Sequence, residues 1–130
     1  MIHSLSINST RREELIDITA QVKKIIDKGG VKNGVCFIYT PHTTAALTIN
    51  ENADPSVRRD ILTWLESLKL ENMRFSHLEG NSPAHIKSSL IGCSLFVLIE
   101  DGRLQLGTWQ GIYFCEFDGP RTRSVMIRLD

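Results

Sequence analysis

Hydrophobic residues recur along this chain at two spacings, which separate predicted strands from predicted helices. Short runs of apolar or alternating residues are typical of strands. They span residues 2–8, 35–39, 44–49, 95–99, 104–106, 112–117 and 124–129. Apolar residues at helical spacing predict one helix before residue 29, a second after residue 54 and a short third one over 82–90. This order, with a run of strands at the end, predicts an α+β fold with a largely antiparallel sheet or sandwich.

Capping residues set the expected bounds of the first helix. Thr10 to Glu13 has the pattern of a capping box, in which a hydroxyl and a carboxylate each satisfy a free backbone N–H. The pattern predicts a helix that ends at Gly29–Gly30, because glycine enters the left-handed conformation without steric cost. The apolar face of this helix comprises Leu15, Ile18, Val22, Ile25 and Ile26.

The later elements have similar start signals. Asp54–Pro55 and Ser82–Pro83 each combine a capping side chain with a first-turn proline. Helical spacing after Pro55 places Trp64 in the core. Its neighbours on that face are Val57, Ile61, Leu65 and Leu68. Asp101–Gly102 predicts a two-residue hairpin turn.

Length and composition narrow the class of protein. A chain of 130 residues predicts one domain over residues 1–130. Equal numbers of basic and acidic residues, 15 of each, argue against a general binder of nucleic acid or of membrane surfaces. Cys36, Cys93 and Cys115 lie in or beside apolar runs, so we expect buried free thiols and a reducing compartment. The chain begins without a signal-peptide pattern, so we expect a cytoplasmic location.

Three of the four histidines lie in short polar segments, where binding and catalysis concentrate. His42 follows Pro41, and His77 and His85 bracket a segment that contains Asn81. His85 falls in the first turn of the third predicted helix, where the helix dipole favours neutral imidazole, the form that binds metal. Three histidines with one open position are typical of a catalytic zinc site. The alternative is that these side chains cap turns and bind backbone groups.

Three further clusters could carry chemistry. Glu51 and Asn52 follow a predicted strand and, with Asn81, are candidate catalytic residues. Trp109 lies between glycines, either exposed for stacking on a planar ring or buried at a strand bulge. Arg121 and Arg123 follow a tight turn, either as ligands of a phosphate or as solvated charges on an edge strand. Fingerprints of phosphate-binding loops, dinucleotide-binding folds and serine hydrolases are absent.

Several stretches together resemble one known family. The longest are Ser94 to Gly102 and Gly107 to Ile112. The others are Pro41 to Ala46, Asn50 to Pro55, His77 to His85 and Asp118 to Arg121. On these motifs, which extend over nearly the whole chain, the sequence resembles the YjbQ-like family, which carries the label secondary thiamine-phosphate synthase.

The resemblance implies a compact β-sandwich with helices packed outside, assembled as a homotrimer with sites near the subunit boundaries. It also implies that His42, His77 and His85 converge on a divalent metal. The implied reaction joins a pyrimidine pyrophosphate to a thiazole phosphate, with Arg121 and Arg123 on phosphate and Trp109 near the pyrimidine. Such a displacement usually requires magnesium held by carboxylates, whereas a site of three histidines suits zinc better.

The sequence therefore leaves three hypotheses. The first is a thiamine-phosphate synthase that uses a metal held by the histidines. The second is a metal-dependent hydrolase of a small phosphorylated or acyl substrate, with Glu51 as general base. The third is a trimer that binds a small metabolite without catalysis.

Overall fold

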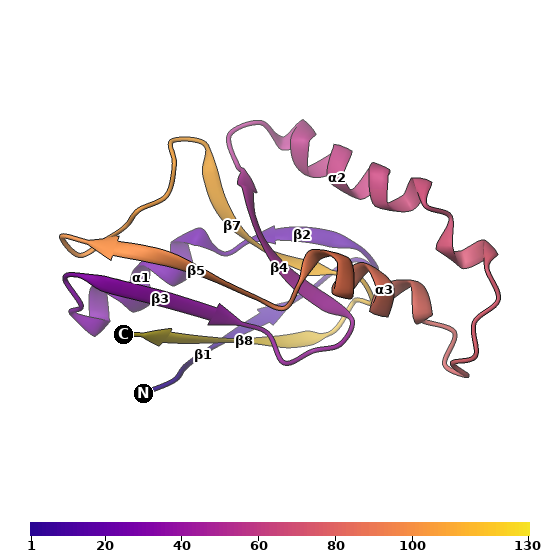
Figure 1. Ribbon diagram of the computed structural model, residues 1–130, viewed down its shortest axis with the longest axis horizontal. Coiled ribbons are helices and arrows are strands. Elements are labelled where there is room, and N and C mark those ends of the chain that lie inside the picture. Colours follow the sequence, from indigo (N-terminus) through magenta and orange to yellow (C-terminus); the bar gives the residue numbers. More distant parts are fainter.

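Two antiparallel sheets build the fold, which the computed structural model describes from Met1 to Asp130 (Figure 1). The larger sheet has five strands in the order β1-β8-β3-β5-β6, and the smaller has three in the order β2-β7-β4. The strands are β1 (His3–Asn8), β2 (Glu14–Asp17), β3 (Gly34–Tyr39), β4 (Ala45–Glu51), β5 (Ser94–Glu100), β6 (Arg103–Leu104), β7 (Gln110–Glu116) and β8 (Thr122–Leu129). The helices are α1 (Thr19–Gly29), α2 (Pro55–Ser67), α3 (Ser82–Ile91) and the short 3-10 helix η1 (Leu70–Asn72). This architecture confirms the predicted α+β fold.

The main core lies between the sheets and beneath α1. Alternate strand residues point into it, so Cys36 and Ile38 of β3 are fully buried while Phe37 and Tyr39 are exposed. A second, smaller cluster holds α2 and α3 against the three-stranded sheet through Leu65 and other apolar side chains. None of the helices is both long and apolar enough to span a bilayer.

The predicted capping box is wrong. Residues Glu14–Asp17 form strand β2, paired with β7, and the helix begins only at Thr19. The Glu14 carboxylate accepts the backbone N–H of Thr10 at 2.6 Å within a loop. Ile18 is the N-cap, and the side chain of Asp17, one residue earlier, accepts both the N–H and the hydroxyl of Thr19. The predicted end is confirmed, since Gly30 caps α1 with φ 67°.

Helix α2 begins as predicted but presents a different face. Asp54 caps it by accepting the N–H of Ser56 at 2.9 Å. Leu65 is 1% exposed, whereas Trp64 is 62% exposed, so the prediction of a core tryptophan is wrong. The helix lies along one margin of the small sheet, and only a narrow stripe of it meets the other apolar side chains (Figure 1).

The remaining local predictions mostly hold. Helix α3 begins at Ser82 with Pro83 in its first turn. The predicted cap is wrong, because Ser82 is already helical and Asn81 is the N-cap, without a side-chain hydrogen bond. Asp101 and Gly102 adopt φ values of 51° and 75°, which form the tight turn between β5 and β6. Strand β6 stops at Leu104, earlier than predicted.

The three thiols have different surroundings. Burial raises the pKa of the Cys36 thiol to about 11 and that of Cys115 to about 12. Both cysteines are buried as expected, but Cys93 is exposed. Cys93 lies just outside β5, in the turn that leaves α3, and that position keeps it out of the core.

Candidate functional site

Three separate segments bring histidines to one hollow of about 340 Å³. His42 comes from the β3–β4 connection, His77 from the segment between α2 and α3, and His85 from the first turn of α3. None of the residues that line the hollow is hydrophobic. We call it the histidine pocket. Glu79, Asn81, Arg121 and Arg123 also line it.

His77 and His85 face one another directly. Their ring centroids are 5.3 Å apart and the ring planes are at 89°. Glu79 lies beside His77, with a carboxylate oxygen 4.0 Å from Nε2. The side chains of His77 and Glu79 are 44% and 74% exposed, so both reach solvent at the rim. The two imidazoles can therefore contact the same ligand from neighbouring directions.

His42 is fixed more firmly than the other two histidines. Its Nε2 accepts the backbone N–H of Ser124 in β8 at 2.9 Å. Burial lowers the pKa of His42, and the positive charge of Arg123 lowers it further. A neutral ring that accepts at Nε2 carries its proton on Nδ1. His42 therefore offers the pocket a hydrogen-bond donor.

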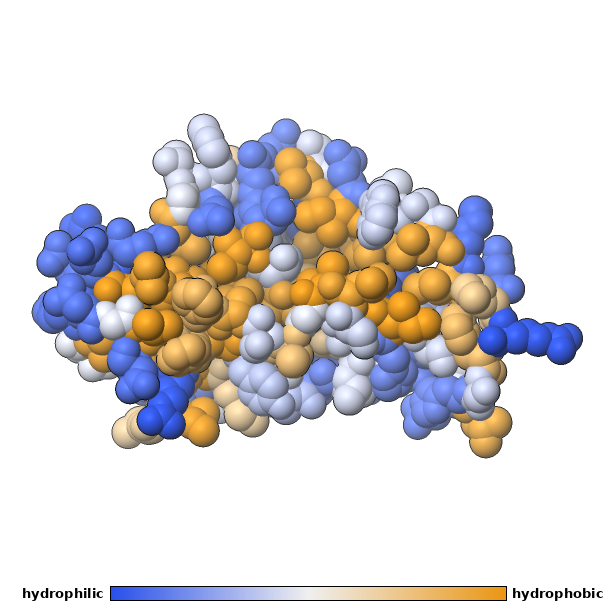
Figure 2. All heavy atoms as spheres, in the orientation of Figure 1, coloured by the Kyte–Doolittle hydropathy of each residue, from blue (hydrophilic) through white to orange (hydrophobic).

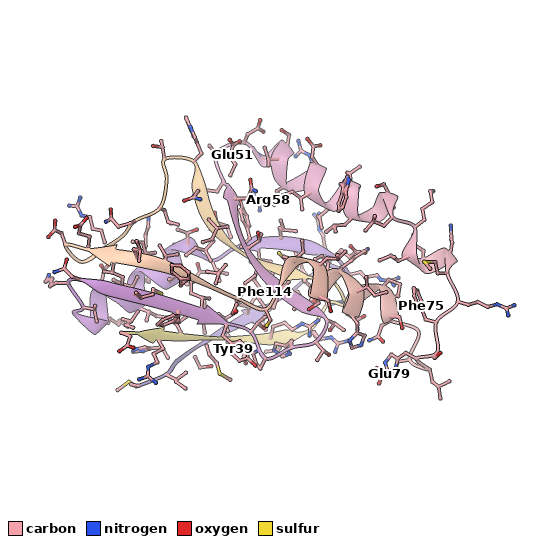
Figure 3. The ribbon with its side chains drawn as sticks, in the orientation of Figure 1. Tyr39, Glu51, Arg58, Phe75, Glu79 and Phe114 are labelled. Atoms are coloured by element: carbon pink, nitrogen blue, oxygen red, sulfur yellow. The ribbon has the colours of Figure 1, made fainter.

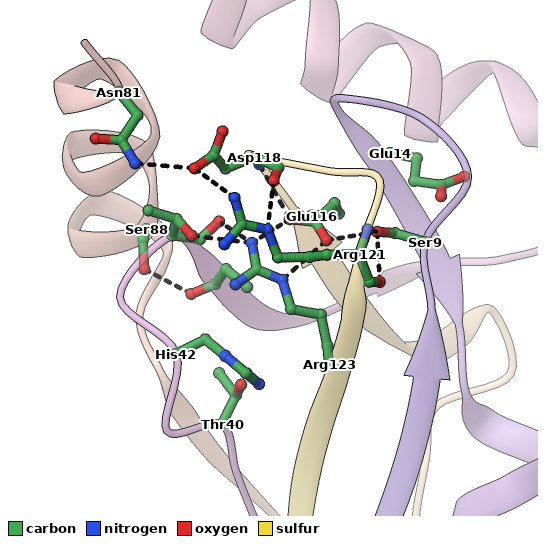
Figure 4. Close-up of polar contacts among 12 residues, drawn as sticks. Ser9, Glu14, Thr40, His42, Asn81, Ser88, Glu116, Asp118, Arg121 and Arg123 are labelled. Atoms are coloured by element: carbon green, nitrogen blue, oxygen red, sulfur yellow. Dashed lines mark hydrogen bonds and ion pairs between the residues drawn. The ribbon is translucent and has the colours of Figure 1, made fainter. Parts of the chain in front are cut away.

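A buried ion pair forms the floor of the pocket (Figure 4). Glu116 is fully buried and Arg123 is 2% exposed. The Arg123 guanidinium donates to both oxygens of Glu116 and to the hydroxyl of Thr44. Burial alone would raise the pKa of Glu116, but hydrogen bonds from Arg123, Ser9 and the N–H of Asp118 hold this pKa below its usual value. Because Glu116 ends β7 and Arg123 lies in β8, the pair joins the two sheets.

Above this floor, Asp118 joins two pocket residues. Its carboxylate accepts from the Asn81 side-chain amide at 2.9 Å and from Arg121 at 3.1 Å (Figure 4). Arg121 remains 51% exposed. The Oδ1 atom of Asn81 is buried and has no hydrogen-bond partner. Arg121 is thus the arginine that can reach a ligand, while the guanidinium of Arg123 is held by Glu116.

The structure places the other predicted site residues elsewhere. Glu51 and Asn52 lie at the far end of β4 from the histidine pocket, and the N–H of Asn52 donates to the backbone oxygen of Trp109. Strand β4 has seven residues, which corresponds to about 20 Å between its ends. Figure 3 shows Glu51 and Glu79 at widely separated ends of the molecule. Within one chain, the histidines and this second cluster form separate surfaces.

Trp109 is exposed, so the interpretation that it is buried at a strand bulge is wrong. Its side chain is 63% exposed. The nearby Gly111 permits a close approach of the chain, since a Cβ there would lie 2.5 Å from Nδ2 of Asn52.

Sequence reasoning missed Ser9 and Glu116, and it gave no role to Asp118, which begins one of the family motifs. All three organise the pocket. A signal for the buried pair existed, because Glu116 follows the apolar run of β7 and Arg123 shares the alternating inward positions of β8 with Val125 and Ile127. A charged residue at an inward position usually has a buried partner of opposite charge. Strand β8 lies between β1 and β3, so the edge-strand interpretation of Arg123 is wrong.

Comparisons with known proteins agree with this fold. Residues 3–129 match the model of the family described as UPF0047 protein YjbQ-like. The UPF0047 protein MJ1081 of Methanocaldococcus jannaschii is 54% identical over 99% of this chain and 94% of its own. The UPF0047 protein YugU of Bacillus subtilis is 52% identical, over 99% of this chain and 98% of its own.

Solved structures give the same result. A YjbQ/UPF0047 family protein of Clostridium acetobutylicum superposes with a TM-score of 0.95 at 51% identity, covering 98% of this chain and 99% of its own. A protein of unknown function from Sulfolobus solfataricus superposes with a TM-score of 0.94 at 33% identity, covering 99% of this chain and 95% of its own. From its sequence and its fold alike, the chain belongs to the YjbQ-like UPF0047 family.

Proposed function

We propose that this protein is an enzyme that acts on a small phosphorylated molecule in the histidine pocket, and that hydrolysis of the phosphate ester is the reaction. The observation that carries the proposal is that three histidines and Arg121, from four separate segments, line one hollow without hydrophobic residues. A polar hollow of about 340 Å³ suits a compact, charged group. Phosphate is such a group, and arginine and imidazole N–H groups are its usual partners.

Arg121 is the expected phosphate ligand. Its Nε and one terminal nitrogen donate to Asp118, which fixes the plane of the guanidinium. The other terminal nitrogen keeps its donors for a ligand. The Nδ1–H of His42 provides a second donor, because the Ser124 N–H holds the opposite side of that ring. Together these groups would bind the phosphate and stabilise the charge that develops during its transfer.

A divalent metal, with zinc the first choice, is part of the proposal. His77 and His85 fit it, since two imidazoles on one tetrahedral zinc have ring centroids about 5 Å apart and these are 5.3 Å apart. His42 would have to break its hydrogen bond with the N–H of Ser124 before it could join them. In the present structure, no three His, Cys, Asp or Glu side chains are placed to hold one metal ion. When bound, zinc would polarise a phosphoryl oxygen.

The chain's own residues supply the proton transfer. Glu79 lines the pocket and is 74% exposed, so its carboxylate is placed to take a proton from the attacking water at the pocket rim. His77, with Nε2 4.0 Å from that carboxylate, is kept as a metal ligand. Glu51 cannot act as this base within one chain, because it lies at the opposite end of β4.

Synthesis of thiamine phosphate is the second candidate, and the family resemblance favours it. That reaction requires a surface for the pyrimidine ring beside the phosphates. Trp109, the residue expected to supply it, does not line the pocket. Hydrolysis needs one phosphorylated substrate and water, whereas synthesis needs two phosphorylated substrates bound together, so we place hydrolysis first.

One set of assays separates these candidate functions. The purified protein is tested on a panel of phosphate monoesters, with zinc and with chelator, and separately on the pyrimidine pyrophosphate and thiazole phosphate. We expect ester turnover that falls by about 100-fold or more in His77→Ala and is unchanged in Glu51→Gln, the matched control. If thiamine phosphate forms and no ester is turned over, the reaction is synthesis and not hydrolysis. Binding of phosphate without either reaction would leave only a binding protein.

We also propose that the protein forms a homotrimer through the outer face of the five-stranded sheet. Phe37 and Tyr39 of β3 and Phe96 and Leu98 of β5 point outward and are 44–59% exposed. Figure 2 shows hydrophobic residues gathered in a band across this face. A contiguous apolar patch on a small protein commonly marks an interface with another chain.

A further inference from the structure

A second hollow of about 280 Å³ lies next to the histidine pocket, and His77 lines both. Its other walls come from the segment between α2 and α3, from the start of α3 and from Arg12. Met73 and Phe75 provide its apolar surface. We call it the Phe75 hollow. A molecule whose phosphate occupies the histidine pocket would place its next atoms at the boundary marked by His77.

The apolar side chains of the Phe75 hollow have no role in the core. Met73 is 59% exposed and Phe75 is 38% exposed, and neither belongs to a core cluster. An aromatic face and a thioether are the side chains that favour contact with a flat ring. Arg12 and Glu71 bring one charge of each sign to the walls, so the hollow has no net preference for a charged group.

The segment that carries both residues can adjust to a ligand. The hydrogen bonds of residues 73–80 stay within residues 70–80, and every residue from 71 to 80 is exposed. A segment with few buried contacts and only local hydrogen bonds moves at low free-energy cost. Phe75 and His77 can therefore close on the two parts of one molecule together.

We propose that the Phe75 hollow binds the organic part of the phosphorylated substrate, and that this part is a small, uncharged, flat ring. The inference rests on the proposed function, because the phosphate of the same molecule occupies the histidine pocket. It differs from the family-based expectation for Trp109, which lies beyond the far end of β4. A hollow of about 280 Å³ has room for a single ring, since a cavity of about 150 Å³ already binds benzene.

Two phosphonates that cannot be hydrolysed test this inference. Phenylphosphonate carries a ring, and methylphosphonate carries the same anionic group without one. Calorimetric titration of the whole protein should show phenylphosphonate binding about tenfold more tightly. Phe75→Ala should reduce that preference below about threefold and leave methylphosphonate binding unchanged. Phe75→Tyr, which keeps the ring, should retain the preference. Leu78→Ala is the matched control, since Leu78 is fully exposed and lines neither hollow.

The outcomes distinguish this inference from the proposed function. If methylphosphonate and inorganic phosphate bind but the ring adds no affinity, the inference fails and the phosphate site stands. The inference also fails if the preference survives Phe75→Ala in a variant whose thermal unfolding matches the wild type. If neither phosphonate nor inorganic phosphate binds, the proposed function fails, and this inference fails because it depends on that function.

Discussion

Glu116 and Arg123 form a buried ion pair that joins the two sheets beneath the candidate site. Nε of Arg123 donates to one carboxylate oxygen at 2.9 Å and a terminal nitrogen donates to the other. Ser9 adds a hydrogen bond of 2.6 Å to the same carboxylate, and its hydroxyl also accepts the N–H of Arg121. Through these contacts, the pair fixes the turn that carries Asp118 and Arg121. The geometry of the pocket therefore depends on Glu116, a fully buried carboxylate that does not itself line the pocket.

Removal of one partner should destabilise the fold strongly. Arg123→Met leaves the buried Glu116 carboxylate without its counter-ion, so we expect a loss of about 3–5 kcal/mol in the free energy of unfolding. Arg121→Met should cost less than about 1 kcal/mol, because that side chain is half exposed. Urea denaturation of the two variants measures the difference. Equal losses in both would show that the buried pair has no special role.

Stability should also fall in acid because of Glu116. Its pKa in the folded protein is held below 4.5, its ordinary value, so its contribution to stability is present above about pH 4.5. That contribution is lost as the pH falls through the lower, folded pKa. Thermal unfolding between pH 7 and pH 3 should therefore show a smaller pH dependence for Glu116→Gln than for the wild type. If the pH dependence of unfolding in the variant equals that of the wild type, Glu116 does not cause the loss of stability in acid.

His42 should remain neutral and keep one tautomer. Burial and Arg123 lower its pKa below the ordinary 6.5, so the unfolded chain takes up the proton first. The contribution of His42 to stability is present above pH 6.5 and is lost as the pH falls through its folded pKa. Nitrogen chemical shifts from NMR should place the proton on Nδ1 at about pH 7. A proton on Nε2 would mean that the Ser124 bond is absent in solution.

Metal binding should depend on His77 and His85 more than on His42. The rings of His77 and His85 have their centroids 5.3 Å apart, whereas Nε2 of His42 already accepts the N–H of Ser124. We expect the double variant His77→Ala, His85→Ala to lose zinc affinity by about 100-fold or more and His42→Ala by about tenfold, within the range seen for loss of single supporting groups. Titration with a competing chelator gives these values. Glu51→Gln serves as the control, and full retention of zinc in the double variant would exclude the site.

The sequence predicted the regular elements where local signals agree with distant contacts. The Asp54 cap, the Gly30 stop and the Asp101–Gly102 turn act within a few residues, and all three are present. The Thr10–Glu13 pattern failed because Glu14–Asp17 pair with β7 as a strand and Glu13 has a distant partner. Glu13 binds Lys87 at 3.0 Å, from 74 positions away. No local pattern contains that contact.

The same distinction applies to the candidate site. The histidines were recognisable because each occurs in a short polar segment, and the structure brings all three to one pocket. The second cluster could not be separated from them by sequence, since Thr44, just before β4, and Glu51, at its end, are close in the chain. Only the extended conformation of β4, about 3.3 Å per residue, places them on different surfaces.

Association of the chains should depend on the outer face of the five-stranded sheet. If the exposed aromatic residues of β3 and β5 join three chains, the mass in solution should be three times the chain mass of 14.7 kDa. A charge at the centre of such a face opposes association, because it must lose its hydration on burial. Phe96→Asp should therefore shift the species toward 14.7 kDa in analytical ultracentrifugation. Trp64→Asp, on the equally exposed α2, is the matched control and should leave the mass unchanged. A monomeric wild type at micromolar concentration would contradict the proposed trimer, and the apolar face would then need another partner.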